Sequence, residues 1–335
     1  MADAPPGRLK ARRVETTLAS GWKFFKSLFE SEPTGHASVA SDFVLADIDK
    51  AIDLPMADTP PGRLRARRVE TALASGWKLF KPLFESEPIG HTSVFVGPSA
   101  LGSWPVDAAE TVQSTQMDSI RPMMFAPTIS VASAARKKSR GRAITNVLLL
   151  SYGGVDLTST QKEIGDIKTA YGSRVTLLDG KAVGKAEVLD ALSGAYDVIH
   201  FCGHGEFDYL EPMQSKIYFH ADKGFDGVVT AADILHCGSI GHHPIVVLSA
   251  CTSALVLPNG SNNYLGLAGA LLRTGATSIV GARWPISDTV GAAFSKHFHT
   301  RLAGGHSVDE AVSFAKNLLR DARLDEWSAF MSIGG

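Results

Sequence analysis

Residues 197–208 read DVIHFCGHGEFD, and residues 244–253 read PIVVLSACTS. Each stretch begins with an apolar run of strand length and ends in polar residues that include a histidine or a cysteine. Residues 277–288, TSIVGARWPISD, follow the same pattern and end with a tryptophan and an aspartate. Apolar runs of this kind are typical of strands that are buried on both faces of a sheet.

Further elements are predicted on both sides of these three stretches. Additional strands are expected at 146–152, 175–178 and 216–220, and helices at 159–171, 185–192, 265–273, 289–302 and 308–323. This alternation favours an α/β fold with a mainly parallel sheet flanked by helices. Loops at the carboxyl ends of parallel strands meet at one edge of the sheet, so we expect His204 to lie near Cys251.

A neighbouring histidine and cysteine can perform nucleophilic catalysis. A thiol attacks a carbonyl only as the thiolate, and an imidazole can take its proton and later deliver it to a leaving amine. The oxyanion that forms needs backbone N–H donors. The amides of Gly205, which has no Cβ in the way, and of Cys251 are the candidates.

Four motifs in order resemble those of the CHAT domain family, which belongs to the caspase-like cysteine peptidases. They are His200–Gly205, Val246–Thr252, Gly266–Asp288 and Glu326–Gly334. The histidine precedes the cysteine by 47 residues (251 minus 204), close to the caspase spacing. The resemblance covers about residues 144–335.

The resemblance implies a caspase-like fold and hydrolysis of peptide bonds in protein substrates, without cofactor or metal. Carried over by position, His204 is the base, Cys251 the nucleophile, and Gly205 and Cys251 supply the oxyanion amides. Trp284 and Asp288 would lie on the substrate-facing edge. Such domains often act in defence, stress or cell-death pathways, where an attached module regulates the protease.

Substrate specificity stays open at the level of sequence. Arg283 would favour an acidic residue before the cleaved bond, whereas Asp208 or Asp288 would favour a basic one, and a basic preference would make the 136–142 cluster a self-processing site. Alternative roles are packing for Trp284, helix capping for Asp288 and a solvated loop position for Asp208.

The other two cysteines are expected to have no catalytic role. Cys202 lies within a predicted strand and is expected in the core. Cys237 is close to His236, His242 and His243, but their spacing fits no common zinc pattern.

The front of the chain contains a duplication. Residues 1–39 recur at 56–94 with about four positions in five identical. Each copy predicts one amphipathic helix, on which Val14, Leu18 and Trp22, or Val69, Leu73 and Trp77, share a face. The helices could pack on each other or on the main domain, dock a protein activator or a second copy, or bind weakly to a membrane surface.

Residues 95–143 are rich in Ser, Pro and Ala without a sustained period, which predicts a flexible linker. The linker ends in basic residues: Arg136, Lys137, Lys138, Arg140 and Arg142. The predicted organisation is therefore a duplicated segment at 1–94, a linker at 95–143 and the catalytic domain at 144–335.

Composition narrows the class of protein. Lys and Arg total 33 against 34 Asp and Glu, which gives no general reason to expect nucleic acid as a partner. Three cysteines without paired spacing favour a reducing, cytoplasmic location, and neither a signal peptide nor a membrane-spanning run is expected.

The main alternative to a peptidase is a catalytically inactive scaffold that binds proteins through its repeats. A nucleotide-binding domain fits less well, because Ser151–Val155 lacks the spacing of a phosphate-binding loop.

Overall fold

The computed structural model describes residues 93–96 and most of the chain from residue 120 to residue 334. Within the latter range, residues 121, 128, 140–141, 153–157, 181–183, 209, 222–225, 251–256, 259–263, 284–285, 323 and 325 are not described. All described residues belong to one unit, Asp58–Gly335. Nearly all of the duplicated segment predicted at 1–94 lies outside the described residues, as do Cys251 and Trp284.

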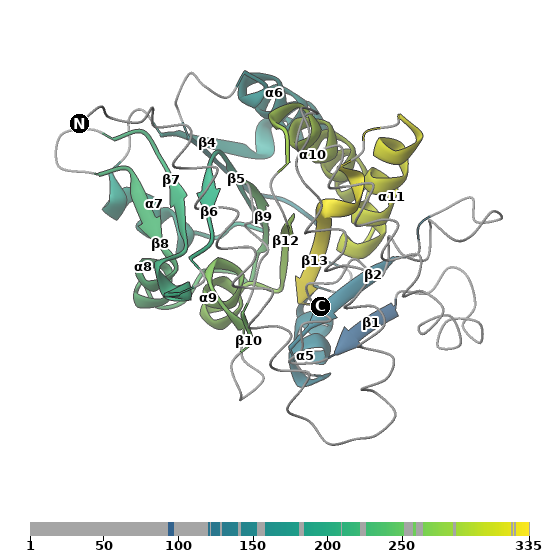
Figure 1. The fold of residues 1–335 in the computed structure, drawn as a ribbon. Helices are drawn as coiled ribbons and strands as arrows, with labels where there is room; N and C mark the ends of the chain where they lie inside the picture. Colours follow the sequence, from purple (N-terminus) through teal and green to yellow (C-terminus); the bar gives the residue numbers. More distant parts are fainter. Residues whose placement is uncertain are drawn as a thin grey trace, which may run out of the picture. The chain divides into compact units, whose positions relative to one another are not determined.

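Five parallel strands form the centre of the structure (Figure 1). In spatial order they are β4 (Val175–Asp179), β3 (Val147–Ser151), β5 (Val198–Cys202), β9 (Ile245–Ser249) and β12 (Ser278–Ala282). Every residue of β3, β5 and β12 is buried, because helices cover both faces of the sheet. This explains why these strands read as continuous apolar runs rather than as alternating patterns.

Three more strands extend the sheet beyond β12. β13 (Phe330–Gly334) pairs antiparallel with β12, and β2 (Met123–Ala126) and β1 (Ser93–Val96) follow parallel to β13. In the described part of the chain the sheet thus has eight strands, and β12–β13 is its one antiparallel pair. The expected α/β fold with a mainly parallel sheet is confirmed.

Two layers of helices enclose the sheet (Figure 1). One face packs against α6 (Thr160–Tyr171), α10 (Asp288–Ala303) and α11 (Val308–Asp321), and the other against α7 (Lys185–Leu192), α8 (Ala231–His236) and α9 (Leu267–Thr274). Alternate residues of each central strand enter the two cores: Leu149 faces the first layer, whereas Leu148 and Leu150 face the second.

Short elements complete the edge at the carboxyl ends of the parallel strands. β6 (Gly205–Glu206), β7 (Lys216–Tyr218) and β8 (Val228–Thr230) form a small antiparallel sheet, and β10 (Leu257–Pro258) pairs with β11 (Tyr264–Leu265). In the described part of the chain, single-turn 3₁₀ helices also occur at Pro212–Gln214 and Trp327–Ala329, and another directly precedes β4 at Gly172–Arg174, at the opposite edge. β6 begins directly after His204, so this small sheet fixes the chain on the far side of that residue.

The predicted linker differs from the structure. Residues 95–143 contain β2, whose four residues are all buried, and α5 (Ile129–Ser139), which packs beside β1, β2 and β13. Much of the range is therefore part of the folded domain. The buried strand MMFA was missed because it is only four residues long and lies between two prolines, so it gives no sustained periodicity. Within the described residues, no helix has the length and apolar composition needed to cross a bilayer.

The contribution of β2 can be tested by removing one buried ring. Phe125 is 1% exposed, and the Arg283 guanidinium lies 5.1 Å from its ring centroid. We expect Phe125→Ala to lower the free energy of unfolding by about 3–5 kcal/mol. Urea unfolding measures this value, and Leu210→Ala, at a side chain that is 93% exposed, is the control. If the free energy of unfolding changes by no more than about 0.5 kcal/mol, as for a surface substitution, β2 does not pack as described.

Candidate active site

The pairing of β5 with β9 brings two polar loops to the same edge of the sheet. The strands are parallel, with Cys202 opposite Ser249. The amide of Gly203 then donates to the carbonyl of Ser249 across 3.2 Å, so the pairing continues one residue past β5. His204 lies two residues after Cys202, and Cys251 lies two residues after Ser249. Ala250 is described, whereas Cys251 lies outside the described residues.

His204 is held by neighbours on two sides. Its carbonyl accepts a hydrogen bond from the amide of Tyr218 on β7, across 2.9 Å. Its ring meets the ring of Tyr152 edge-on, with centroids 5.0 Å apart. Tyr152 follows β3 directly, and its amide donates to the Cys202 carbonyl across 2.8 Å. The ends of β3 and β7 thus both help to place the imidazole.

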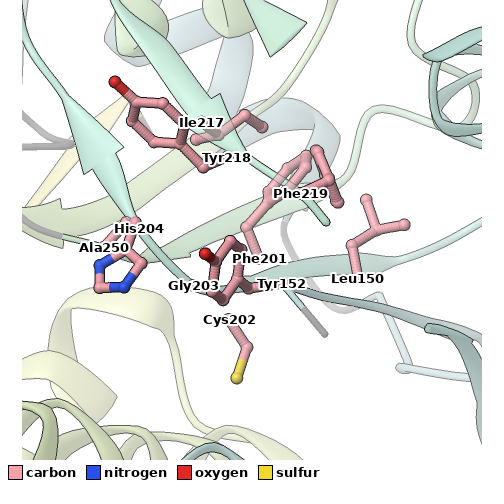
Figure 2. Close-up of a pocket in the computed structure, with 10 residues that line it drawn as sticks. All are labelled: Leu150, Tyr152, Phe201, Cys202, Gly203, His204, Ile217, Tyr218, Phe219 and Ala250. Atoms are coloured by element: carbon pink, nitrogen blue, oxygen red, sulfur yellow. The ribbon is translucent and has the colours of Figure 1, made fainter. Parts of the chain in front are cut away.

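A small hollow opens beside His204 (Figure 2). It is lined by residues from the ends of β3, β5, β7 and β9: Leu150, Tyr152, Phe201, Cys202, Gly203, His204, Ile217, Tyr218, Phe219 and Ala250. β4 lies on one side of β3 and β5 on the other, so the hollow lies where the order of the strands reverses. Ligands of open α/β sheets bind at this kind of position.

Glycines on both sides of His204 serve different purposes. A Cβ on Gly203 would stand 2.8 Å from the Cβ of Tyr152, so only glycine fits between β5 and that ring without a shift. Gly205 faces Ile217 in the small sheet, and the neighbouring His204–Tyr218 pair carries the ladder hydrogen bond. Because hydrogen-bonded and non-bonded pairs alternate, the Gly205 amide points away from β7. That amide is therefore not used by the ladder.

Arg283 and Asp208, two of the predicted substrate-binding residues, both contact backbone groups of the domain. Arg283 is 2% exposed, and its guanidinium donates to the carbonyls of Ser328 and Phe330. Asp208 accepts from two backbone amides within its own loop, those of Leu210 and Glu211. These contacts hold β13 and the loop after β6, respectively. Trp284 lies outside the described residues.

Asp288 links two helices. It is the first residue of α10, and its carboxylate accepts from the amide of Ser159, 2.6 Å away, and from the Thr158 hydroxyl at 3.4 Å. The carboxylate thereby binds the start of α6. The helix begins one residue earlier than expected and Ser287 is its N-cap, so Asp288 does not cap its own helix, and its carboxylate binds the neighbouring one instead.

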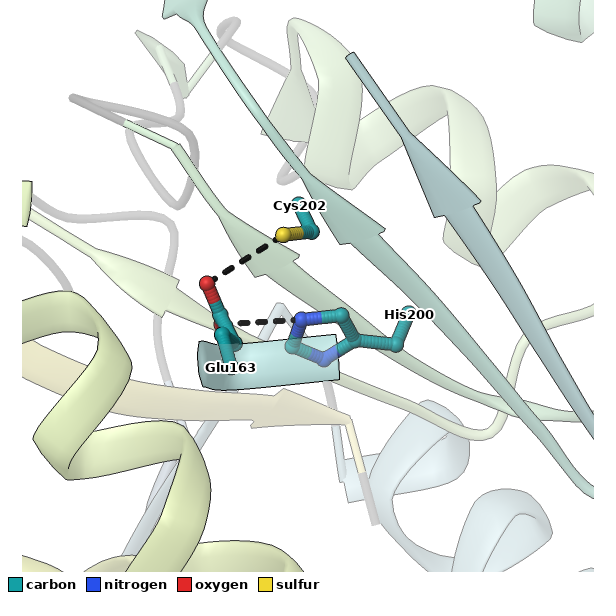
Figure 3. Close-up of side chains that lie close together, drawn as sticks. All are labelled: Glu163, His200 and Cys202. Carbon is teal, nitrogen blue, oxygen red and sulfur yellow. Dashed lines mark hydrogen bonds and ion pairs between the residues drawn. The ribbon is translucent and has the colours of Figure 1, made fainter. Parts of the chain in front are cut away.

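A buried polar cluster lies at the carboxyl end of β5, on the face of the sheet that packs against α6 and α10 (Figure 3). Glu163 of α6 accepts from His200 Nε2 at 3.0 Å, from Cys202 Sγ at 3.2 Å and from the hydroxyl of Ser295 on α10. Glu163, His200 and Cys202 are 3%, 0% and 2% exposed. His299 of α10 continues the chain of contacts, with its Nε2 2.9 Å from His200 Nδ1.

The protonation states in this cluster follow from burial and hydrogen bonding. Burial would raise the pKa of Glu163, but hydrogen bonds and the charge interaction with His200, together with the Ser295 and Ser249 hydroxyls, lower the pKa overall. Burial, and next the charge of Glu163, raise the pKa of the Cys202 thiol well above its usual value. Cys202 therefore stays protonated and is not a nucleophile, which confirms its expected place in the core.

One group of three possible metal ligands occurs in the described part of the chain. The ligand atoms of Glu163, His200 and Cys202 lie within 4.8 Å of one another. The Glu163 carboxylate already accepts hydrogen bonds from both His200 and Cys202. Cys237, which was considered above as a possible zinc ligand, donates its thiol proton to the Ile234 carbonyl.

Comparison with known families agrees with this geometry. The model of the CHAT domain matches residues 94–335. The chain belongs to the CHAT domain family. The match begins at β1, which accounts for the folded part of the predicted linker. No protein with a curated description matches the chain in sequence.

Solved structures share the fold of this CHAT domain at low sequence identity. Saccharomyces cerevisiae separase in complex with securin superposes with a TM-score of 0.54 at 16% identity, over 79% of this chain and 17% of separase. The Arg-specific cysteine proteinase gingipain R superposes with a TM-score of 0.54 at 10% identity, over 82% of this chain and 68% of gingipain. The complex of Porphyromonas gingivalis RgpB pro- and mature domains gives 0.51 at 11% identity, over 90% and 77%. The CHAT chain thus spans less than a fifth of the length of the separase it matches.

Sequence reasoning missed the cluster around Glu163, although a signal was present. Thr160, Ile164, Ile167 and Tyr171 form the buried face of α6, and Glu163 lies among them. A carboxylate on the apolar face of a helix is rarely buried without partners. Likewise, His200 interrupts an otherwise apolar strand. Polar residues at core positions are thus the sequence signal for this cluster.

The buried histidine His299 predicts a pH dependence of stability. Burial, and next the charge of His200, hold its pKa well below 6.5. His299 therefore stays neutral in the folded state, whereas in the unfolded chain it takes up a proton as the pH falls below 6.5. Stability should decrease between pH 7 and pH 5, by at most about 1.4 kcal/mol per pH unit for this group.

Chemical unfolding at several pH values measures this decrease. His299→Gln keeps a polar side chain but cannot titrate, so its curve should be flatter than that of the wild type. His220→Gln, at an exposed histidine, should follow the wild type. Equal slopes for all three proteins would show that His299 takes up a proton in the folded state.

Proposed function

We propose that this CHAT domain is a cysteine endopeptidase in which His204 is the base and Cys251 is the nucleophile. The observation that carries the proposal is the register of β5 and β9. It brings the loop with His204 next to Ala250, the residue bonded to Cys251. The peptidase fold shared with separase and gingipain R supports the same reaction class.

The proposed reaction uses only groups of the chain, the substrate and water. His204 takes the proton from the Cys251 thiol, and the thiolate sulfur bonds to the carbonyl carbon of the substrate peptide. The amides of Gly205 and Cys251 stabilise the resulting oxyanion. When the C–N bond breaks, the imidazolium gives its proton to the leaving amine. Water then attacks the thioester with His204 again as base, which releases the acid and restores the thiol.

The proposed oxyanion role of Gly205 agrees with its backbone direction. Its amide is turned away from β7, so binding an oxyanion would not break the small sheet. Its partner strand β7 also carries Tyr218, whose amide holds the His204 carbonyl. One short antiparallel sheet would therefore support both the base and one oxyanion donor.

Residues 1–94 are proposed to regulate the peptidase by binding a protein activator or a second copy of the chain. The duplication of the amphipathic pattern supports this proposal, because two similar helices offer two similar binding faces. Separase, which shares the fold, is solved together with a protein partner, securin. We propose a cytoplasmic setting and a role in defence, stress or cell death.

Cleavage of a peptide library tests the catalytic proposal. We expect the wild type to cleave, Cys251→Ala to have no activity, and His204→Ala to lose roughly 10²–10⁴-fold in kcat/KM. Cys237→Ala is the matched control, because this half-buried thiol lies outside the site and should leave the rate unchanged. The cleaved sequences would also give the preference at the position before the scissile bond.

Equal cleavage by wild type and Cys251→Ala would assign the activity to another source and contradict the proposal. Absence of cleavage by the wild type, with the full chain and after addition of candidate activators, would favour the inactive scaffold that binds through its repeats. A chain beginning at residue 93, which retains β1, separates inhibition by the front segment from a requirement for it.

A further inference from the structure

Glu163 holds the end of the strand that precedes the proposed base. Its carboxylate accepts from the thiol of Cys202, the last residue of β5, across 3.2 Å, and from His200 in the same strand across 3.0 Å. Cys202 lies two residues before His204. A third donor, the Ser295 hydroxyl, comes from α10. One side chain of α6 thus holds the end of β5 against α10.

The burial of this carboxylate needs an explanation. Removing a charged group from water carries a large cost unless hydrogen bonds replace its hydration. A well-packed apolar side chain at such a site is often as good for stability, or better. Stability alone therefore gives little reason to place an ionised glutamate between α6 and the sheet. The three donors around Glu163 point to a requirement for fixed geometry.

The orientation of His200 is fixed from its other side. A carboxylate only accepts, so His200 Nε2 donates to Glu163 across 3.0 Å. His200 Nδ1 lies 2.9 Å from His299 Nε2, and the hydroxyl of Tyr171 lies 3.1 Å from His299 Nδ1. The network thus runs from Tyr171 through both rings to Glu163. All three side chains are buried, so the ring next to Glu163 has little freedom to move.

We infer that Glu163 is a positioning residue that fixes the end of β5 against α6 and α10, and through it the position of His204 relative to Cys251. The inference rests on the proposed function for its catalytic consequence. An amide at this position could not accept from all three donors, because one of its two heteroatoms is itself a donor. The end of β5 at Cys202 would then lose its bond, and the loop with His204 would shift.

The test compares Glu163→Gln with a matched variant at the opposite end of the same strands. Asp197 is also a buried carboxylate, and it accepts from the amides of Thr145 and Asn146 and from the Thr145 hydroxyl. Asp197→Asn therefore removes a comparable charge and comparable hydrogen bonds at the amino ends of β3 and β5. Both variants are made in the full chain, and unfolding curves record their stability.

Two readouts separate positioning from general destabilisation. For Glu163→Gln we expect kcat to fall roughly 100-fold while KM stays within about twofold, because misplacement of reacting groups by about 1 Å costs that much. The rate of Cys251 alkylation by iodoacetamide, followed by mass spectrometry across pH, should move its midpoint to higher pH, because a more distant imidazole stabilises the thiolate less. Asp197→Asn should match the wild type in both readouts.

Several outcomes would overturn the inference. Wild-type kcat and alkylation profile in a folded Glu163→Gln would make Glu163 purely structural, and equal changes in both variants would reduce the effect to lost stability. Bound zinc in the purified wild type, absent from Glu163→Gln, would make the cluster a metal centre instead. If Glu163→Gln does not fold, Ser295→Ala removes only the bond from α10 and should change kcat and alkylation in the same direction, to a smaller extent; no change there would also overturn the inference.

The alkylation profile keeps this inference distinct from the proposed function. It needs no substrate, so a chain that cleaves no peptide still reports whether Glu163 affects the reactivity of Cys251. A wild type without peptidase activity but with a Glu163-dependent profile would contradict the proposed function and support the positioning role.

Discussion

The in-register pairing of β5 with β9 is the constraint on which the rest of the structure depends. Side chains alternate between the two faces of a strand, so a slip of one residue would turn every side chain of β5 to the other face. His200 and Cys202 would then leave the layer of α6 and α10, and their partners there would lose their bonds. The same slip would displace His204 relative to Ala250. The register therefore sets the apolar core, the polar cluster and the candidate active site together.

The layer between α6, α10 and the sheet contains two environments in one core. Near the middle of the strands it is aliphatic and aromatic, with Leu149 and Phe298 as examples, and such packing tolerates small adjustments when volume is conserved. Towards the carboxyl ends it becomes polar, and hydrogen bonds of fixed length and direction replace non-directional contacts. Directional contacts thus occur at the end of the sheet where the candidate catalytic loops begin, and this arrangement restricts movement where accuracy matters most.

Much of the fold and part of the site could be predicted from sequence. The long apolar runs and the alternation of periods indicated the central strands and the main helices, and the polar loop ends indicated His204 and its position at the strand edge. β13 and β2 could not be found in this way, because they are short and their pairing partners lie far away in sequence. The backbone contacts of Arg283 and Asp208 were also out of reach, since the sequence does not show where the Ser328 carbonyl and the Leu210 amide lie.

The pairing of β2 with β13 has a consequence for how the domain is made. Phe125 and Ile333 are neighbours in the sheet, although more than 200 residues separate them in the chain (333 minus 125 is 208). Contacts between distant segments form late, because closing a long loop carries an entropic cost before the contact forms. During synthesis β2 would therefore wait until β13 has left the ribosome, with its apolar residues exposed meanwhile. A nascent chain would hold the loop of His204 well before its sheet is complete, so the complete sheet, and any activity that depends on it, would arise only after β13 has been made.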